Sequence, residues 1–174
     1  MAEALGRRGA SVTLAGRPDS IEHRLAGQAG LEFDAFRVEG IPRRASLHTV
    51  GALLRAVVAP AECVRILRRR RPDAVLGAGG YVGGPMVLAA GTLRIPAALT
   101  EADAHLGLAN RLAAPFAKRV FCAFPIEGLN GPKYEVVGRP IPDRSRVPDR
   151  AAARKAFGLP TEGRVVLVFG GSQG

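Results

Sequence analysis

Several features are scarce in this chain of 174 residues, and each scarcity narrows what the protein can be. Tryptophan is absent and aromatic residues make up only 5% of the sequence, so a nucleic-acid surface built on stacked rings is not expected. The only cysteines, Cys63 and Cys122, lack metal-ligand or CxxC spacing, and we expect two reduced core residues in a cytoplasmic protein. No apolar run approaches the ~18 residues that cross a bilayer, so any membrane contact should be peripheral.

Acidic residues are also few, with 15 Asp and Glu against 25 Lys and Arg, which gives a net charge of +10. Such a surplus favours anionic partners, such as phosphorylated substrates or acidic lipid headgroups. The three histidines are scattered, and no cluster of residues predicts a metal site. No glycine segment matches a Walker A motif or a complete GxGxxG fingerprint, so a P-loop and a nicotinamide or flavin site are not supported.

Short apolar runs alternate with helical segments along the chain, which is typical of a parallel sheet with crossover helices. The expected strands cover residues 11–15, 32–38, 73–76, 95–99, 119–124 and 134–137, and the expected helices cover 21–30, 47–71, 86–93, 106–117 and 149–157. Pro60 should divide or kink the long helical region. We predict an α/β fold with a Rossmann-like doubly wound parallel sheet over residues 1–138. An interdomain linker and short helix should follow over 139–163, and the first strand of a second domain over 164–174.

Residues 1–9 are expected to form the end of a helix, and a helix in such a fold normally follows a strand. We therefore expect one strand and its loop to be missing before Met1.

The glycine-rich segment at residues 77–85 is the most distinctive stretch, with five glycines among its nine residues. It follows an apolar run and precedes an expected helix, and the backbone N–H groups of such a turn suit a phosphate. The alternative is a tight turn that needs glycine only for its backbone freedom. A second glycine segment at residues 170–174 also follows an apolar run, and its Ser172 hydroxyl would suit a phosphate.

Two carboxylates, Glu101 and Asp103, follow the expected strand at 95–99, where open α/β sheets hold their ligands. Two residues apart in an extended chain, they should face the same way, as a base or as ligands of sugar hydroxyls. In the alternative, Asp103 caps the helix that begins near Leu106.

The basic run Arg68, Arg69, Arg70 and Arg71 ends the long helical region. Cations in a last turn complement the helix dipole, or they can rest on anionic lipid.

Four segments together resemble a known family: RPDAVLGAGGYVGGP at 71–85, GLANRL at 107–112 with APFA at 114–117, VVGRP at 136–140, and FGGSQG at 169–174. In this order they are similar to the MurG family, the peptidoglycan N-acetylglucosaminyltransferases. The resemblance implies the N-terminal domain of a GT-B glycosyltransferase, with the active site between two Rossmann-like domains. It implies inverting transfer of N-acetylglucosamine from UDP-N-acetylglucosamine to undecaprenyl-diphospho-muramoylpentapeptide, without cofactor, at the cytoplasmic face of an anionic membrane.

The resemblance also assigns residues. The acceptor diphosphate would lie beside Gly79, Gly80, Tyr81, Gly83 and Gly84. Glu101 would line the cleft as a catalytic candidate, the basic run Arg68–Arg71 would meet the membrane, and the donor would contact Asp103, Arg139, Gly171, Ser172 and Gln173.

The chain departs from the family at three places. The family commonly has His-Glu-Gln-Asn where residues 100–103 read Thr-Glu-Ala-Asp, and Arg where Pro142 stands. Its first glycine loop, with the proposed base, would precede Met1, and most of the donor domain would follow Gly174. We therefore expect no turnover by the chain alone. Two alternatives are another GT-B lipid glycosyltransferase and a non-catalytic, membrane-docking half of a split enzyme.

Overall fold

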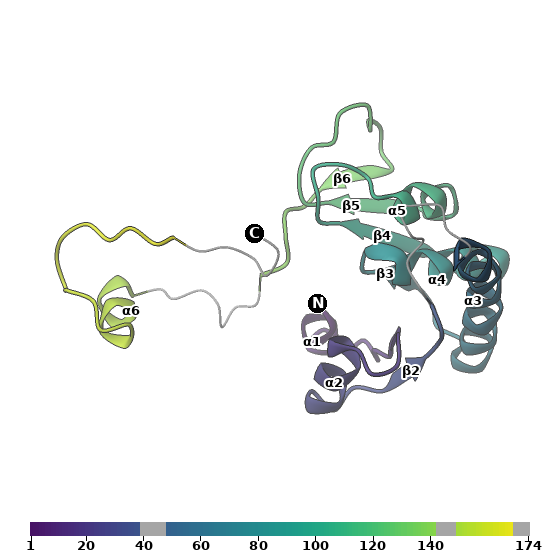
Figure 1. Cartoon of the computed structure of the whole chain (residues 1–174), viewed down its shortest axis with the longest axis horizontal. Helices are drawn as coiled ribbons and strands as arrows, with labels where there is room; N and C mark the ends of the chain where they lie inside the picture. Colours follow the sequence, from purple (N-terminus) through teal and green to yellow (C-terminus); the bar gives the residue numbers. More distant parts are fainter. Residues whose placement is uncertain (39–47, 142–148, 169–174) are drawn as a thin grey trace. The chain divides into compact units, whose positions relative to one another are not determined.

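The computed structural model describes residues 1–38, 48–141 and 149–168 (Figure 1). The chain divides into two compact units, Met1–Arg139 and Pro140–Gly174. Every predicted site residue within the described part belongs to the first unit.

The first unit begins with a small parallel sheet and its helices. In order along the chain these are α1 (Ala2–Gly6), β1 (Leu14–Gly16), α2 (Ile21–Gln28) and β2 (Phe33–Ala35). Strands β1 and β2 pair in parallel with Leu14 opposite Phe33. The Ser20 side chain accepts a hydrogen bond from the His23 N–H and so caps α2.

A four-stranded parallel sheet forms the larger part of the unit (Figure 1). Its strands β3 (Val75–Gly77), β4 (Ala97–Glu101), β5 (Arg119–Cys122) and β6 (Tyr134–Val136) lie side by side in chain order. The connections contain α3 (His48–Arg70), α4 (Gly80–Thr92), α5 (Leu108–Ala113) and the short 3-10 helix η1 (Ala114–Phe116). Parallel strands joined through helices confirm the predicted Rossmann-like α/β class.

The core lies between this sheet and α3, α4 and α5. One face of the strands supplies Leu99 and Val120, which are fully buried, and α3 and α4 supply Cys63 and Val87. Alternation along β4 leaves Leu99 inside, and Leu76 of β3 faces the other way and is 40% exposed. The helices therefore cover the sheet face that carries Leu99 and Val120.

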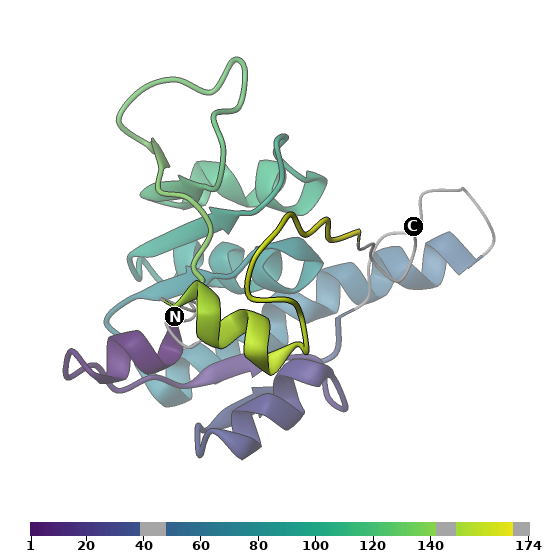
Figure 2. The ribbon, with the colours of Figure 1, turned by 90° about the vertical axis from the view of Figure 1, so that its left-hand side faces the viewer.

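Two expectations about helix boundaries are wrong. Helix α3 (Figures 1 and 2) is one helix from His48 to Arg70, so the expected division at Pro60 is wrong, whereas the alternative of a kink at Pro60 stays a prediction. Buried residues on both sides of the proline, Ala59 and Cys63, anchor the helix against the core, which offsets one lost backbone hydrogen bond. Helix α4 begins at Gly80 and not at Met86, so Pro85, expected just before the helix, lies inside it.

The second unit contains α6 (Arg150–Ala156), which Asp149 caps by accepting a hydrogen bond from the Ala151 N–H at 2.8 Å. The buried Arg154 donates to the carbonyls of Pro160 and Gly163 and so holds the turn after the helix. The strand expected from residue 164 is not formed over the described residues 164–168, whose Val166 and Val168 are more than 80% exposed. A strand needs a neighbour for its backbone hydrogen bonds, and no other strand is described in this unit.

Candidate functional site

The start of α4 combines three groups that suit an anion. Gly79 caps the helix with φ +90°, Gly80 follows with φ +67°, and no side chain caps the first N–H groups. Those N–H groups have no partner within the helix, and they carry its positive dipole end. Arg17, directly after β1, donates from Nη1 to the Tyr81 hydroxyl at 3.3 Å. A guanidinium, a hydroxyl and a helix N-terminus thus meet at the carboxyl edge of the sheets.

The glycines of the segment have different structural reasons. A Cβ on Gly79 would lie 3.2 Å from the Thr100 carbonyl, and one on Gly80 would meet nothing within 4 Å. A Cβ on Gly83 would lie 3.2 Å from the Gly77 Cα, and one on Gly84 would lie 3.4 Å from the Ala109 carbonyl. Gly83 and Gly84 are buried and let α4 approach β3 and α5, so packing alone accounts for them. Their contact with an acceptor stays a prediction.

Glu101 is a buried carboxylate that organises the loop after β4. It is 7% exposed, and it accepts hydrogen bonds from the Asp103 N–H at 3.1 Å, the Gly107 N–H at 2.9 Å and the Asn110 amide at 2.9 Å. Burial alone would raise the pKa of Glu101, but these hydrogen bonds together outweigh it and hold the pKa below its ordinary value. A carboxylate whose pKa is lowered in this way is a weaker proton acceptor than a free one, and the catalytic role of Glu101 stays a prediction.

Asp103 does not share the environment of Glu101. Its side chain is 67% exposed, so the expectation that both carboxylates face the same way is wrong, because the chain turns after Glu101 instead of staying extended. The alternative of a helix cap is also wrong. Helix α5 is capped by Gly107, whose N–H donates to Glu101.

Arg139 lies at the same edge as Asp103. Its Nη2 donates to the Ala102 carbonyl at 2.7 Å and lies 3.9 Å from Asp103 Oδ1, and its guanidinium lies 5.7 Å from the centre of the Phe124 ring. The structure therefore brings together two of the predicted donor contacts, Asp103 and Arg139. The other three, Gly171, Ser172 and Gln173, lie outside the described residues.

Sequence reasoning missed Asn110 and Arg17. Asn110 is 1% exposed and donates from Nδ2 to the Thr100 carbonyl at 3.0 Å and to Glu101, which fixes α5 to the end of β4. The position of Asn110 within the GLANRL segment could have indicated its importance. For Arg17 the only indication in the sequence was its place directly after a short strand.

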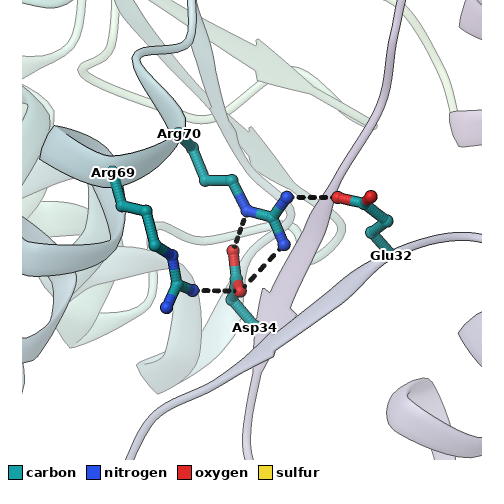
Figure 3. Close-up of polar contacts among 4 residues, drawn as sticks. All are labelled: Glu32, Asp34, Arg69 and Arg70. Carbon is teal, nitrogen blue, oxygen red and sulfur yellow. Dashed lines mark hydrogen bonds and ion pairs between the residues drawn. The ribbon is translucent and has the colours of Figure 1, made fainter.

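The basic run at the end of α3 divides into two pairs. Arg69 and Arg70 bind Asp34 of β2, with Arg70 Nε 2.7 Å from Asp34 Oδ2, and Arg70 also pairs with Glu32 (Figure 3). Hydrogen bonding from Arg70 comes first among the causes that lower the pKa of Asp34. Two of the four arginines predicted to meet a membrane thus tie α3 to β2. Arg68 and Arg71 stay available, at the end of α3 that leads into β3.

Other chemistry is not evident in the described part of the chain. No group of three or more His, Cys, Asp or Glu side chains there is arranged to hold a metal ion. Among the same residues, no helix is long and apolar enough to cross a bilayer. Both cysteines are buried and unpaired, as predicted, and burial raises the pKa of Cys63 to about 12.

Comparison with known proteins places these features in a family. Residues 1–122 match the glycosyltransferase family 28 N-terminal domain. The chain belongs to this family. Two curated relatives, both named UDP-N-acetylglucosamine--N-acetylmuramyl-(pentapeptide) pyrophosphoryl-undecaprenol N-acetylglucosamine transferase, support the same assignment. The relative from Halothermothrix orenii is 35% identical over 100% of this chain and 48% of its own length, and that from Cutibacterium acnes is 40% identical over 99% and 49%.

A solved structure is also similar to this family 28 chain. The crystal structure of MurG from Acinetobacter baumannii aligns with a TM-score of 0.67 at 29% identity, over 80% of this chain and 41% of that one. The fold is accordingly that of the N-terminal half of a GT-B enzyme. The chain spans about half the length of the curated relatives that it matches.

Proposed function

We propose that this chain is the acceptor-side domain of an enzyme that transfers N-acetylglucosamine from UDP-N-acetylglucosamine to undecaprenyl-diphospho-muramoylpentapeptide, with inversion, in peptidoglycan synthesis. The observation that carries the proposal is the anion site at the start of α4, where Arg17, Tyr81 and the Gly79–Gly80 backbone converge. A diphosphate is the group that such a site fits best, because it can take a guanidinium and several N–H donors at once.

The loop between β4 and α5 has a separate role in this proposal. Glu101 and Asn110 fix the loop, and the loop in turn presents Asp103 beside Arg139 at the same carboxyl edge. Asp103 and Arg139 would meet the donor, together with Gly171, Ser172 and Gln173. In the reaction a base removes the proton of the acceptor hydroxyl, the oxygen attacks the anomeric carbon, and UDP leaves from the opposite face. Glu101 serves as a positioning residue and is not assigned as that base.

The proposal includes peripheral contact with an anionic membrane at its cytoplasmic face. Leu108, Leu112 and Phe116 are about half-exposed or more and recur every four residues along α5 and η1. This apolar stripe begins at the carboxyl edge, beside the proposed diphosphate site, and Lys118 follows it. Arg68 lies at the amino end of β3, on the opposite edge. The apolar stripe is therefore the better-placed docking surface for an acceptor carried on a lipid.

A binding experiment with both substrates tests the function. The chain should bind a short-chain analogue of undecaprenyl-diphospho-muramoylpentapeptide in calorimetric titration, should bind UDP-N-acetylglucosamine much more weakly, and should show no transfer when both are present. Binding of UDP-N-acetylglucosamine with higher affinity than the acceptor analogue would contradict the assignment of this domain to the acceptor.

A further inference from the structure

A groove of about 530 Å³ lies between α5, η1 and the connection from β5 to β6. Part of its wall is apolar and includes Leu106 and Ile126. The polar part includes Arg111 and Lys133 with one acid, Glu127, and His105 also lines it. The groove thus combines apolar surface with two permanent positive charges.

The two cations of the groove are not used by the fold. The side chains of Arg111 and Lys133 make no hydrogen bond or ion pair with any described residue. In contrast, Arg69, Arg70, Arg139 and Arg154 all have such partners. Unpaired cations on a partly apolar groove suit an extended ligand that carries carboxylates and small apolar groups, which is the chemistry of an acidic peptide.

The groove adjoins the proposed site. His105 and Leu106 belong to the loop that Glu101 holds, and the same loop carries Asp103. Lys133 directly precedes β6, so the groove runs from the carboxyl edge at His105 toward the amino end of β6, which lies three strand positions, about 14 Å, from β3. A sugar followed by five residues, at roughly 3.3 Å per extended residue, spans more than about 16 Å and can reach along the groove. A ligand with its diphosphate at the start of α4 can therefore place a peptide in the groove.

We propose that this groove binds the peptide of the acceptor, and that Arg111 and Lys133 pair with its carboxylates. The inference rests on the proposed function, since the acceptor named there carries a pentapeptide. The site is distinct from the diphosphate site at α4, so the two can be tested separately.

The test uses N-acetylmuramoyl-pentapeptide as a soluble probe that lacks the diphosphate. Calorimetric titration of the chain should show binding, and the variant R111Q/K133Q should bind at least tenfold more weakly. The matched control R65Q/K118Q removes the same charge from exposed positions outside the groove and should bind like wild type. Amidation of the probe's carboxylates should lower its affinity for the wild-type chain at least tenfold and should leave its affinity for R111Q/K133Q unchanged. Equal binding by R111Q/K133Q and its control, or equal binding of the amidated probe, would overturn the proposal.

Two further titrations distinguish the groove from the diphosphate site and from a lipid-binding surface. Farnesyl diphosphate binding should be unchanged in R111Q/K133Q and weakened in R17Q. If R17Q binds farnesyl diphosphate like wild type while the peptide titrations give the expected results, the diphosphate site and the proposed function are wrong, but the groove still binds an acidic peptide. Binding to phosphatidylglycerol vesicles should fall no more in R111Q/K133Q than in R65Q/K118Q, which removes the same charge. If vesicle binding is lost while peptide binding is kept, the groove holds a lipid headgroup and the proposal is wrong. Thermal unfolding of R111Q/K133Q should match wild type, because neither native side chain pairs with a described residue.

Discussion

Replacing Glu101 separates a positioning carboxylate from a catalytic base. Gly107 and Asn110 both donate to Oε2 of Glu101, and Asp103 donates to Oε1. In Glu101→Gln the amide oxygen can take the place of Oε2 and keep the buried Asn110 satisfied, while the amide N–H₂ then faces the Asp103 N–H, which lies in the loop and can turn to water. The loss is therefore the charge assistance of two hydrogen bonds together with the bond to Asp103, about 2–3 kcal/mol in the free energy of unfolding. For a chain of this size, this corresponds to a fall in Tm of roughly 5–10 °C.

The pH dependence gives the sharper test. The pKa of Glu101 is lowered in the folded protein, so its contribution to stability is complete above the ordinary value of 4.5 and is lost as pH falls through the folded pKa. The difference in Tm between wild type and Glu101→Gln should thus be full at pH 7 and should shrink in acid. Thermal unfolding followed by circular dichroism at several pH values measures it. Equal Tm values at pH 7, or a difference that persists unchanged in strong acid, would refute the positioning role.

The remaining predictions concern packing, thiol chemistry and membrane contact. Gly83→Ala should destabilise the protein by about 1–3 kcal/mol in urea unfolding, because its Cβ would meet the β3 backbone at 3.2 Å; wild-type stability would show that α4 does not lie that close. The Cys63 thiol should not react with iodoacetamide at pH 8 in the folded protein, since its pKa is about 12, and rapid alkylation detected by mass spectrometry would contradict its burial. Leu108→Ser with Leu112→Ser should reduce sedimentation with phosphatidylglycerol vesicles at least tenfold, whereas Arg68→Gln should have little effect. A larger loss of vesicle binding in Arg68→Gln than in the double leucine variant would indicate that the membrane contacts the opposite edge of the sheet.

The sequence predicted the order and type of most elements because the signals for them are local. Alternating apolar residues and turn residues located β6 (Tyr134–Val136) and α6 (Arg150–Ala156) to within one or two residues. The start of α4 was misplaced because glycine has a low helix propensity. In the structure Gly83 and Gly84 let the helix pack closely against β3 and α5. These contacts join residues that become neighbours only in the folded sheet.

The sequence predicted where the candidate site lies in the fold but not how its side chains are arranged. Polar and glycine residues after strands indicated the carboxyl edge, but the pattern could not tell that Glu101 is buried while Asp103 is exposed, because that depends on where the loop turns. A run of four arginines likewise does not reveal which of them point toward β2, and in the structure Arg69 and Arg70 bind Asp34 of that strand. The burial of Glu101 and the pairing of Arg69 and Arg70 both depend on residues that are distant in the sequence.

Affinity for a diphosphate at the start of α4 tests the central claim most directly. Titration with farnesyl diphosphate should show binding to the wild-type chain, with at least a tenfold loss in Arg17→Gln, because one charge-assisted hydrogen bond contributes about 1.5–3 kcal/mol. Tyr81→Phe should lose a smaller factor, of about 2- to 10-fold, for one neutral hydrogen bond. Arg24→Gln, which removes an exposed charge from α2, should bind like wild type. If Arg17→Gln binds no more weakly than Arg24→Gln, the diphosphate does not lie at this helix and the acceptor-side account is wrong.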